Sequence, residues 1–257
     1  MRDINFIIRF KYSFLVILFI MIAGQNSIIC QPVNITDQLI LHHPFDGNSN
    51  DESRNGNDAV VHGAILGEDR NGNPAGAYYF DGLDDYIELN DDFDYPNRSV
   101  CLWFRAIKVP VWIPGYKDLS LDILYTSDHP DLKYGLTKLW ISKMDDVDMV
   151  FFHNGGATNI DDFAYEIIPN QWNFVVITVT PDMIHYYLNG LPVGKRVFPG
   201  NIHSYEVTPL KNAALGIGRK LNHRFYNGAI DDVYIYNRAI NACEVLYLYN
   251  GSLQEER

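Results

Sequence analysis

The chain has 257 residues and a formal net charge of −12, and its aromatic residues include 17 Tyr and 14 Phe. The negative charge argues against binding to nucleic acid or to anionic membrane surfaces, because both reward Lys and Arg. It favours solubility, and it raises the expectation of divalent cations as partners. The aromatic content is typical of a β-rich chain, in which aromatic side chains suit pleated, half-buried surfaces.

The N-terminal segment has the pattern of a secretory signal peptide. Arg2, Arg9 and Lys11 precede an apolar run from Phe14 to Ala23, which matches the charged and apolar regions of such a segment. The run has only about half of the ~20 apolar residues that a transmembrane anchor needs. We therefore predict a signal peptide over residues 1–30 and a chain that is exported, either secreted or retained at the cell envelope.

The exact end of this segment and the state of the cysteines stay open at this stage. Cleavage is expected after Gly24 or after Cys30. A lipid anchor at Cys30 is disfavoured, because Ile28-Ile29 stands where a lipoprotein signal has small residues. The remaining cysteines, Cys101 and Cys243, could pair with each other or could be buried free thiols.

Beyond the signal peptide, short apolar or alternating runs are separated by Gly, Asn, Asp and Pro at the spacing of a β-sandwich. Asn189-Gly190 predicts a tight hairpin turn, because both residues tolerate positive φ. One helix is predicted over Asn241–Leu248, with Asn241 as its N-cap. We therefore predict a single all-β domain over residues 31–257. The predicted strands are Leu39–His43, Ala59–His62, Ala77–Phe80, Tyr86–Leu89, Ser99–Ala106, Leu121–Thr126, Leu136–Ser142, Met149–His153, Asn173–Thr180, Met183–Leu188, Ala214–Ile217 and Ile230–Tyr236.

An oxygen-rich segment follows the first predicted strand and runs from Pro44 to Asp58. Its acid and amide side chains, among them Asp46, Asn48 and Asp51, are the hard oxygen donors that Ca²⁺ prefers. Ordinary turns are built from the same residue types. The composition of this segment therefore leaves an ion-binding loop and a turn network open.

The last predicted strand carries a carboxylate among apolar residues. Strict alternation places Asp231 on one face with Val233 and Ile235, which are core candidates. Asp231 is therefore expected to point inward, where a carboxylate must be paired, strongly hydrogen-bonded or bound to a metal. Arg219 and Arg238 are the basic residues considered as its partners.

Five segments, taken together and in this order, resemble the LamG-like jelly-roll family of the concanavalin A-like lectin/glucanase superfamily. The resemblance spans Leu39 to about Asn250 and implies two packed antiparallel sheets in a jelly-roll arrangement, closed by one short helix. The matching segments are Pro44-Phe-Asp-Gly-Asn-Ser-Asn-Asp-Glu-Ser-Arg-Asn-Gly, Tyr79-Phe-Asp-Gly-Leu-Asp-Asp-Tyr-Ile87, Gln171-Trp-Asn-Phe-Val-Val-Ile-Thr178 with Tyr186-Tyr-Leu-Asn-Gly190, Leu215-Gly-Ile-Gly218, and Phe225-Tyr-Asn-Gly-Ala-Ile-Asp-Asp-Val-Tyr-Ile-Tyr-Asn-Arg-Ala-Ile240.

The resemblance also implies a structural calcium site that joins a loop near the first strand to the closing strand. On this basis Asp46, Asp51 and Asp231 are the predicted ligands, with Asn48 or a backbone carbonyl completing the shell. The alternative is an Asx-turn network plus one bridge between Asp231 and an arginine. Asp84-Asp85 is a further possible donor pair.

The same superfamily includes glycosidases, so catalysis has to be considered. A retaining glycosidase needs two carboxyl groups ~5 Å apart, and the glucanase branch carries them as Glu-x-Asp-x-x-Glu. The nearest segment is Asp146-Val-Asp148-Met-Val-Phe151, in which Phe151 replaces the last acid. No catalytic residues are therefore predicted, and Asp145–Asp148 is interpreted as a turn between two strands.

Aromatic residues offer a binding surface instead. Trp112 and Tyr116, in the long segment Val109–Asp131, are predicted to contact a ligand; alternatively they pin this loop to the sandwich. Trp172 is expected to bury its ring at one end of the sandwich. We predict a non-catalytic recognition module for an extracellular glycan or surface protein, with structural calcium. A glycoside hydrolase with an atypical acid pair and an adhesion protein without a small ligand are the alternatives.

Overall fold

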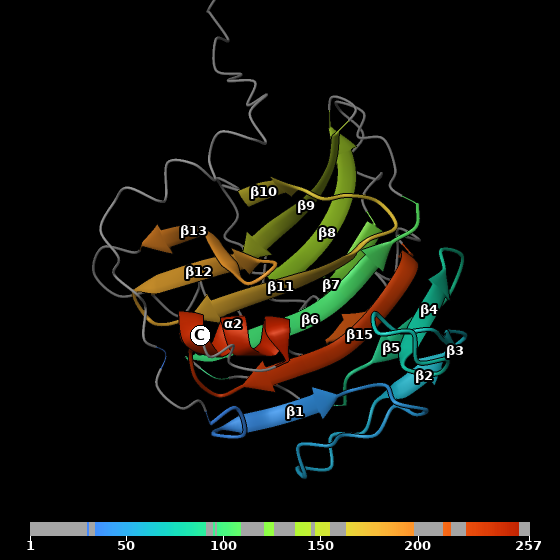
Figure 1. The fold of residues 1–257 in the computed structure, drawn as a ribbon, viewed down its shortest axis with the longest axis horizontal. Helices are drawn as coiled ribbons and strands as arrows, with labels where there is room; N and C mark the ends of the chain where they lie inside the picture. Colours follow the sequence, from blue (N-terminus) through green and yellow to red (C-terminus); the bar gives the residue numbers. More distant parts are fainter. Residues whose placement is uncertain are drawn as a thin grey trace, which may run out of the picture. The chain divides into compact units, whose positions relative to one another are not determined.

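The computed structural model of the protein contains two antiparallel sheets and one helix within its described residues (Figure 1). Residues 33–257 form one compact unit, and of residues 1–32 the structure describes only Cys30. The predicted ligand-binding residues Trp112 and Tyr116 lie outside the described part of the chain. The described residues are 30, 34–90, 95, 97–108, 121–125, 137–144, 147–154, 163–197, 213–216 and 225–251.

The first sheet, sheet A, has eight strands within the described residues, in the order β13-β12-β11-β6-β15-β4-β3, and β1 pairs with β15 beside this path. Its strands are β1 (Leu39–His43), β3 (Ile65–Gly67), β4 (Ala77–Asp81), β6 (Arg98–Ala106), β11 (Trp172–Val179), β12 (Met183–Leu188), β13 (Leu191–Val197) and β15 (Asn227–Tyr236). Asn189 and Gly190, which join β12 to β13, have φ angles of 51° and 80°. The predicted hairpin turn is therefore confirmed.

The second sheet, sheet B, has seven strands within the described residues, in the order β10-β9-β8-β7-β14-β5-β2. Its strands are β2 (Val60–His62), β5 (Tyr86–Glu88), β7 (Leu121–Tyr125), β8 (Thr137–Met144), β9 (Val147–Asn154), β10 (Phe163–Glu166) and β14 (Ala214–Leu215). Lys143 pairs with Asp148 and Met144 with Val147. The predicted turn between these strands is thus shorter than Asp145–Asp148, because Asp148 already belongs to β9.

The main core lies between the two sheets and takes alternate residues from each strand. On β6, Val100, Leu102 and Phe104 face this core, and on β8 Leu139 and Ile141 do so. Phe80 joins them from β4 and is 3% exposed. This alternation is what two antiparallel sheets packed face to face require. The predicted all-β sandwich is confirmed.

A second apolar cluster covers the outer face of sheet A, and helix α2 (Ala242–Asn250) lies over it (Figure 1). Asn241 caps the helix, since its side chain accepts hydrogen bonds from the backbone N–H groups of Cys243 and Glu244. The Glu244 carboxylate in turn accepts from Asn241 N at 2.7 Å, which completes a capping box. This outer cluster comprises Cys101, Trp103, Phe174, Val176, Tyr187, Tyr236, Ile240, Val245 and Leu248.

Strand β15 is an inner strand of sheet A, and it contains a bulge. It pairs with β6 on one side, and on the other side with β4 over its first half and β1 over its second half. Opposite β6 the register slips between Asp231, which lies across from Trp103, and Tyr234, which lies across from Cys101. Asp232 within this bulge has a φ of 46°, a conformation that residues other than glycine rarely adopt.

The bulge overturns one sequence prediction. Val233 and Ile235 belong to the core between the sheets, as expected. Asp231 does not share their face, because the extra residue in the bulge turns it outward beside Trp103. Strict alternation therefore failed at the position where the strand carries its two acidic residues.

The cysteines do not pair as considered from the sequence. Cys101 is a free thiol and fully buried in the outer cluster. Burial, with the nearby carboxylate of Glu244, raises its pKa well above the ordinary value. Cys243 is disulfide-bonded, and so is Cys30.

Among the described residues, no helix has the length and apolar character needed to cross a membrane.

Candidate functional site

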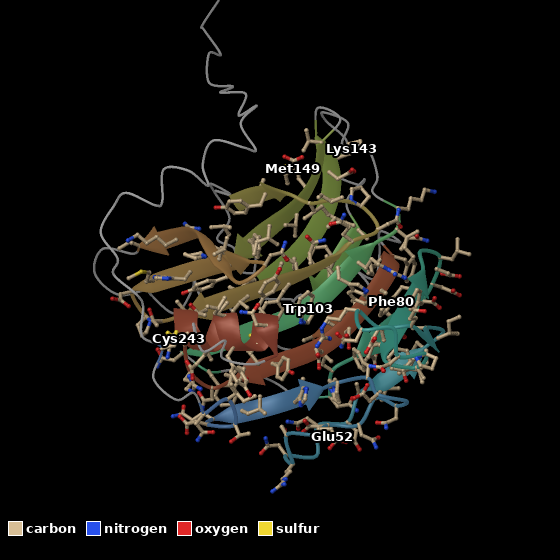
Figure 2. All side chains as sticks on the ribbon, in the orientation of Figure 1. Glu52, Phe80, Trp103, Lys143, Met149 and Cys243 are labelled. Atoms are coloured by element: carbon tan, nitrogen blue, oxygen red, sulfur yellow. The ribbon has the colours of Figure 1, made fainter. Side chains whose placement is uncertain are left out.

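The outer face of sheet A carries a buried charge cluster at the bulge of β15. The guanidinium of Arg70, in the β3–β4 loop, pairs with Asp231 through Nη1 and with Asp232 through Nη2, the latter at 2.5 Å. Its Cζ lies 4.8 Å from the ring centroid of Trp103. Only 2% of the Asp231 side chain is exposed. We call Arg70, Asp231, Asp232 and Trp103 the arginine clasp (Trp103 is labelled in Figure 2).

Local hydrogen bonds hold the β3–β4 loop in the shape that presents Arg70. The Asp69 carboxylate accepts from the backbone N–H groups of Asn71 and Asn73, at 2.7 and 2.8 Å, and from the Asn73 side chain at 2.7 Å. These contacts form an Asx-type turn around the arginine. The loop therefore places the positive charge of the Arg70 guanidinium next to the two carboxylates of the bulge.

Charge crowding within the clasp affects its protonation. Burial, and after it the charge of Asp232, raises the pKa of Asp231 above its ordinary value, while Arg70 acts in the opposite direction. Burial alone would lower the pKa of Arg70, but the two carboxylates outweigh it and raise that pKa. One guanidinium thus serves two adjacent carboxyl groups, and Asp231 takes up a proton more readily than an ordinary aspartate does.

The first strand is tied to the same cluster. His42 Nε2 lies 3.3 Å from Asp232 Oδ1, and the imidazole stacks on Tyr234 with ring centroids 4.2 Å apart. The Tyr234 hydroxyl also donates to Asp232 Oδ1, at 3.3 Å. The resemblance implied a calcium site that joins a loop near the first strand to the closing strand; in the structure, protein side chains connect the first strand itself to the closing strand.

The predicted calcium ligands have other partners in the structure. The Asp51 carboxylate accepts from the backbone N–H groups of His42, Ser53 and Asn57, at 3.0, 2.9 and 3.0 Å. These hydrogen bonds, with one from the Ser53 hydroxyl, lower the pKa of Asp51 although burial opposes them. This is the Asx-turn network that was the alternative interpretation of the segment.

The remaining members of the predicted set do not join Asp51. Asn48 Oδ1 accepts from Asn50 N at 2.7 Å, and Asp46 is exposed. Asp231 pairs with Arg70, which the sequence analysis had not considered as a partner. Among the described residues, Asp46, Asp51 and Asp231 do not form a group of acids close enough to share one ion.

A different acidic group does form, in the turn between β4 and β5. Side-chain oxygens of Asp81, Asp84 and Asp85 all lie within 4.8 Å of one another. The turn is fixed by hydrogen bonds from Asp81 N to Asp85 Oδ2, at 2.8 Å, and from Leu83 N to Asp81 Oδ1, at 2.7 Å. Burial, followed by the charges of Asp81 and Asp84, raises the pKa of Asp85. The Asp84-Asp85 donor pair considered in the sequence belongs to this group.

An open row of side chains crosses the outer face of sheet A beside the clasp. Successive strand pairings place Ile65 opposite Tyr79, Tyr79 opposite Ala229, Ala229 opposite Arg105, and Arg105 opposite Trp172. Directly paired residues on neighbouring strands point to the same face. The five residues therefore form one ladder over β3, β4, β15, β6 and β11, which we call the platform.

The guanidinium of Arg105 is the centre of the platform. Its Cζ lies 5.3 Å from the ring centroid of Tyr79 and 5.4 Å from that of Trp172. Its Nη2 donates to the Tyr79 hydroxyl, which itself donates to Glu68 O at 2.8 Å. Ala229 is fully buried beneath these side chains, whereas Tyr79, Arg105 and Trp172 are each partly exposed.

Trp172 departs from its predicted location. Its ring was expected to be buried at one end of the sandwich. Instead it lies on the outer face, where it stacks with Arg105 and packs at the margin of the outer cluster. The reason is register, because Trp172 pairs with Arg105 and so shares its face, whereas Val175 and Ile177 of the same strand face the main core.

Sequence reasoning did not single out Arg70, Tyr79 or Arg105 as site residues. The position of Arg105 could have been predicted. It follows Trp103 by two residues within a clearly predicted strand, so the two side chains must lie on the same face. The position of Arg70 could not, because it lies in a loop, and only the folded chain brings it to Asp231.

Fold and topology define a jelly-roll β-sandwich of the lectin type. The chain belongs to the concanavalin A-like lectin/glucanases superfamily, whose laminin G model matches residues 70–246. This confirms the resemblance found in the sequence motifs. No curated protein sequence matches the chain.

Several solved structures share this fold. One is domain 4 of AbnA, a GH43 extracellular arabinanase from Geobacillus stearothermophilus, in complex with arabinotriose. It has 18% sequence identity to this chain and a TM-score of 0.58, and the match covers 82% of this chain and 98% of that one. The binding domain of botulinum neurotoxin serotype D has 19% identity and a TM-score of 0.59, over 85% of this chain. That of Paraclostridial Mosquitocidal Protein 1 has 17% identity and a TM-score of 0.59, also over 85%.

The extent of these matches limits what they show. This chain spans about half of each toxin binding domain, 53% in both cases. At such low identity the similarity establishes the fold, and it does not transfer a ligand.

Proposed function

We propose that this protein is an exported, non-catalytic recognition module that binds a carbohydrate on the platform of sheet A. The observation that carries the proposal is the partly exposed stack of Tyr79, Arg105 and Trp172. Aromatic faces of this kind pack against the C–H face of a sugar ring, and the neighbouring donors can bind its hydroxyl groups. Support from the fold is general: one structural neighbour is described in complex with arabinotriose.

The acidic residues of the clasp do not favour catalysis. A glycosidase needs one carboxyl group free to donate a proton and a second one free to attack or to activate water. Asp231 and Asp232 are instead both paired with Arg70, and the Asp231 side chain is almost completely buried. Phe151 also stands where the glucanase motif has its last acid.

Calcium forms a second part of the proposal, with the β4–β5 turn as its site. Three carboxylates within 4.8 Å of one another repel each other unless a cation or protons reduce their charge. Gly63 allows Asp85 to sit close to the β2–β3 connection, since a Cβ at that glycine would lie 2.0 Å from Asp85 Oδ1. A bound ion would thus stabilise the turn that precedes β5.

Affinity electrophoresis of the mature protein in gels containing single polysaccharides tests the binding proposal. The wild-type protein should be retarded by at least one polymer, and Trp172→Ala should lose this retardation. Tyr86→Ala on sheet B is the matched control, because Tyr86 is also a partly exposed aromatic residue that stacks on a neighbour, His62. Equal loss in both variants would contradict a site on the platform. Release of reducing ends by the wild-type protein would contradict the non-catalytic assignment.

A further inference from the structure

We propose that the platform recognises an acidic glycan, with a sugar carboxylate bound by Arg105; this rests on the carbohydrate-binding function proposed above.

Arg105 is a partly buried cation that lacks a carboxylate partner among the described residues. Arg70 pairs with two aspartates, and Arg238 pairs with Glu244 and Asp37. Arg105 instead donates to the neutral hydroxyl of Tyr79 and lies between two rings. In a chain with a net charge of −12, a cation left without a carboxylate on an accessible face is a ready site for an anion from outside.

The guanidinium also keeps unused hydrogen-bonding capacity. Arginine has five N–H donors and no acceptor. Among the described residues, the only hydrogen bond from the Arg105 side chain is the one that Nη2 donates to the Tyr79 hydroxyl, and its Nε is buried without a partner. A carboxylate can accept two parallel hydrogen bonds from a guanidinium, which makes it a better match than a single hydroxyl group.

The two rings indicate that the anion is part of a sugar. Tyr79 and Trp172 flank the guanidinium at similar distances, so a ligand bound to Arg105 also meets an aromatic ring. An acidic sugar provides both features, since it has a C–H face for the ring and a carboxylate at its edge. A peptide would more often pair with a strand edge, whereas the platform lies on a sheet face.

Two polymers with the same sugar backbone distinguish the contribution of the sugar carboxylate from that of stacking on the aromatic rings. Polygalacturonate carries a carboxylate on each sugar, and its methyl-esterified form is neutral. Isothermal titration calorimetry on the mature protein should show at least tenfold tighter binding to polygalacturonate. Added salt should weaken that binding and leave binding to the ester nearly unchanged.

Variants then assign the preference to the platform. Arg105→Gln should bind both polymers with similar, weak affinity, and Arg105→Lys should recover part of the preference, because it restores the charge without the bidentate geometry. Arg54→Gln, in the exposed loop after β1, should behave as the wild-type protein does. If Arg105→Gln fails to fold, the comparison of the two polymers on the wild-type protein still decides whether the ligand is acidic, and Arg105→Lys tests the role of Arg105.

The outcomes distinguish this inference from the proposed function. Equal or tighter binding to the ester would overturn the acidic ligand and keep the carbohydrate-binding function. A preference for polygalacturonate that survives in Arg105→Gln would place the anion elsewhere and overturn the role of Arg105. Absence of binding to these and to neutral polysaccharides, with a folded protein, would overturn both.

Discussion

Arg70 and Asp231 are 161 residues apart in the sequence, yet they form a buried ion pair that joins the β3–β4 loop to β15, an inner strand of sheet A. The pair lies where β15 bulges and changes its partner from β4 to β1. The bulge would otherwise leave two adjacent carboxylates on a face that α2 and the outer cluster partly cover. Arg70 supplies their countercharge, and Trp103 supports its guanidinium from below.

Removal of Arg70 should therefore destabilise the fold strongly. Breaking a buried pair by deleting one partner leaves an uncompensated charge and typically costs about 3–5 kcal/mol. Because 23% of the Arg70 side chain is exposed, we expect Arg70→Met to lie near the lower end, at about 3 kcal/mol. Chemical denaturation at pH 7 measures the change.

The matched control is the exposed Arg54→Met, which should change the free energy of unfolding by less than about 0.5 kcal/mol. Combining Arg70→Met with Asp231→Asn should cost less than Arg70→Met alone, because the double variant has one carboxylate fewer to leave unpaired. Equal stability of Arg70→Met and the wild-type protein would contradict the clasp.

Calcium should act through the β4–β5 turn and not through the loop after β1. We expect added calcium to raise the melting temperature of the wild-type protein by an amount that grows with calcium concentration. A chelator should reverse this increase. Asp84→Asn should remove most of this dependence, since Asp84 is an exposed member of the acidic group. Differential scanning fluorimetry with and without calcium measures both effects.

Asp51→Ala separates the two loops. It should lower stability by about 1–3 kcal/mol, because it leaves the donors of His42, Ser53 and Asn57 without their acceptor. That loss should be the same with and without calcium. A calcium effect that disappears in Asp51→Ala and persists in Asp84→Asn would restore the loop after β1 as the ion site.

The sequence predicted the layers of the fold better than it predicted the site. Hydrophobic runs located β1 and β12 to the residue and Asn241 as a helix cap, because these features depend on local pattern. Short edge strands such as β3 and β10 were missed, since three or four residues give little periodicity.

The site depended on information that local pattern does not contain. A bulge reverses the face of every residue on one side of it, so alternation put Asp231 on the wrong face. The platform arises from the register of five strands, most of which are distant from one another in the sequence. Only the assembled sheet brings Tyr79 next to Arg105 and Arg105 next to Trp172.

His43 should make the fold sensitive to mild acid. This histidine is fully buried, its Nδ1 donates to Asn50 O at 3.1 Å, and its Nε2 has no partner within the described structure. Burial lowers its pKa below 6.5 in the folded state, with a smaller opposing effect from the Asn50 carbonyl. The unfolded chain then binds the proton more tightly, so stability is complete above about pH 6.5 and falls as the pH drops toward the folded pKa.

The slope from this one group approaches about 1.4 kcal/mol per pH unit. His43→Phe should remove it, since phenylalanine does not titrate and can still stack on Phe45. The measurement is the difference in unfolding free energy between wild type and His43→Phe from pH 7.5 to pH 5. The raised pKa of Asp231 changes stability with pH in the opposite direction. Because Asp231 is present in both proteins, its contribution cancels in the difference. A difference that is constant with pH would refute the assignment.

The thiol chemistry of the chain should follow the separation of Cys101 from the other two cysteines. Because Cys101 is free and fully buried while Cys30 and Cys243 are disulfide-bonded, a thiol reagent should label no cysteine in the native protein. Denaturation without reductant should expose one thiol per chain, and reductant should expose three. Mass spectrometry of the labelled protein counts them. Because a disulfide at Cys30 requires that residue in the mature chain, the same spectrum should place signal cleavage before Cys30. This agrees with the alternative position after Gly24 and would correct the predicted signal-peptide range of residues 1–30. A mature N-terminus beyond Cys30, with two free thiols, would refute both statements.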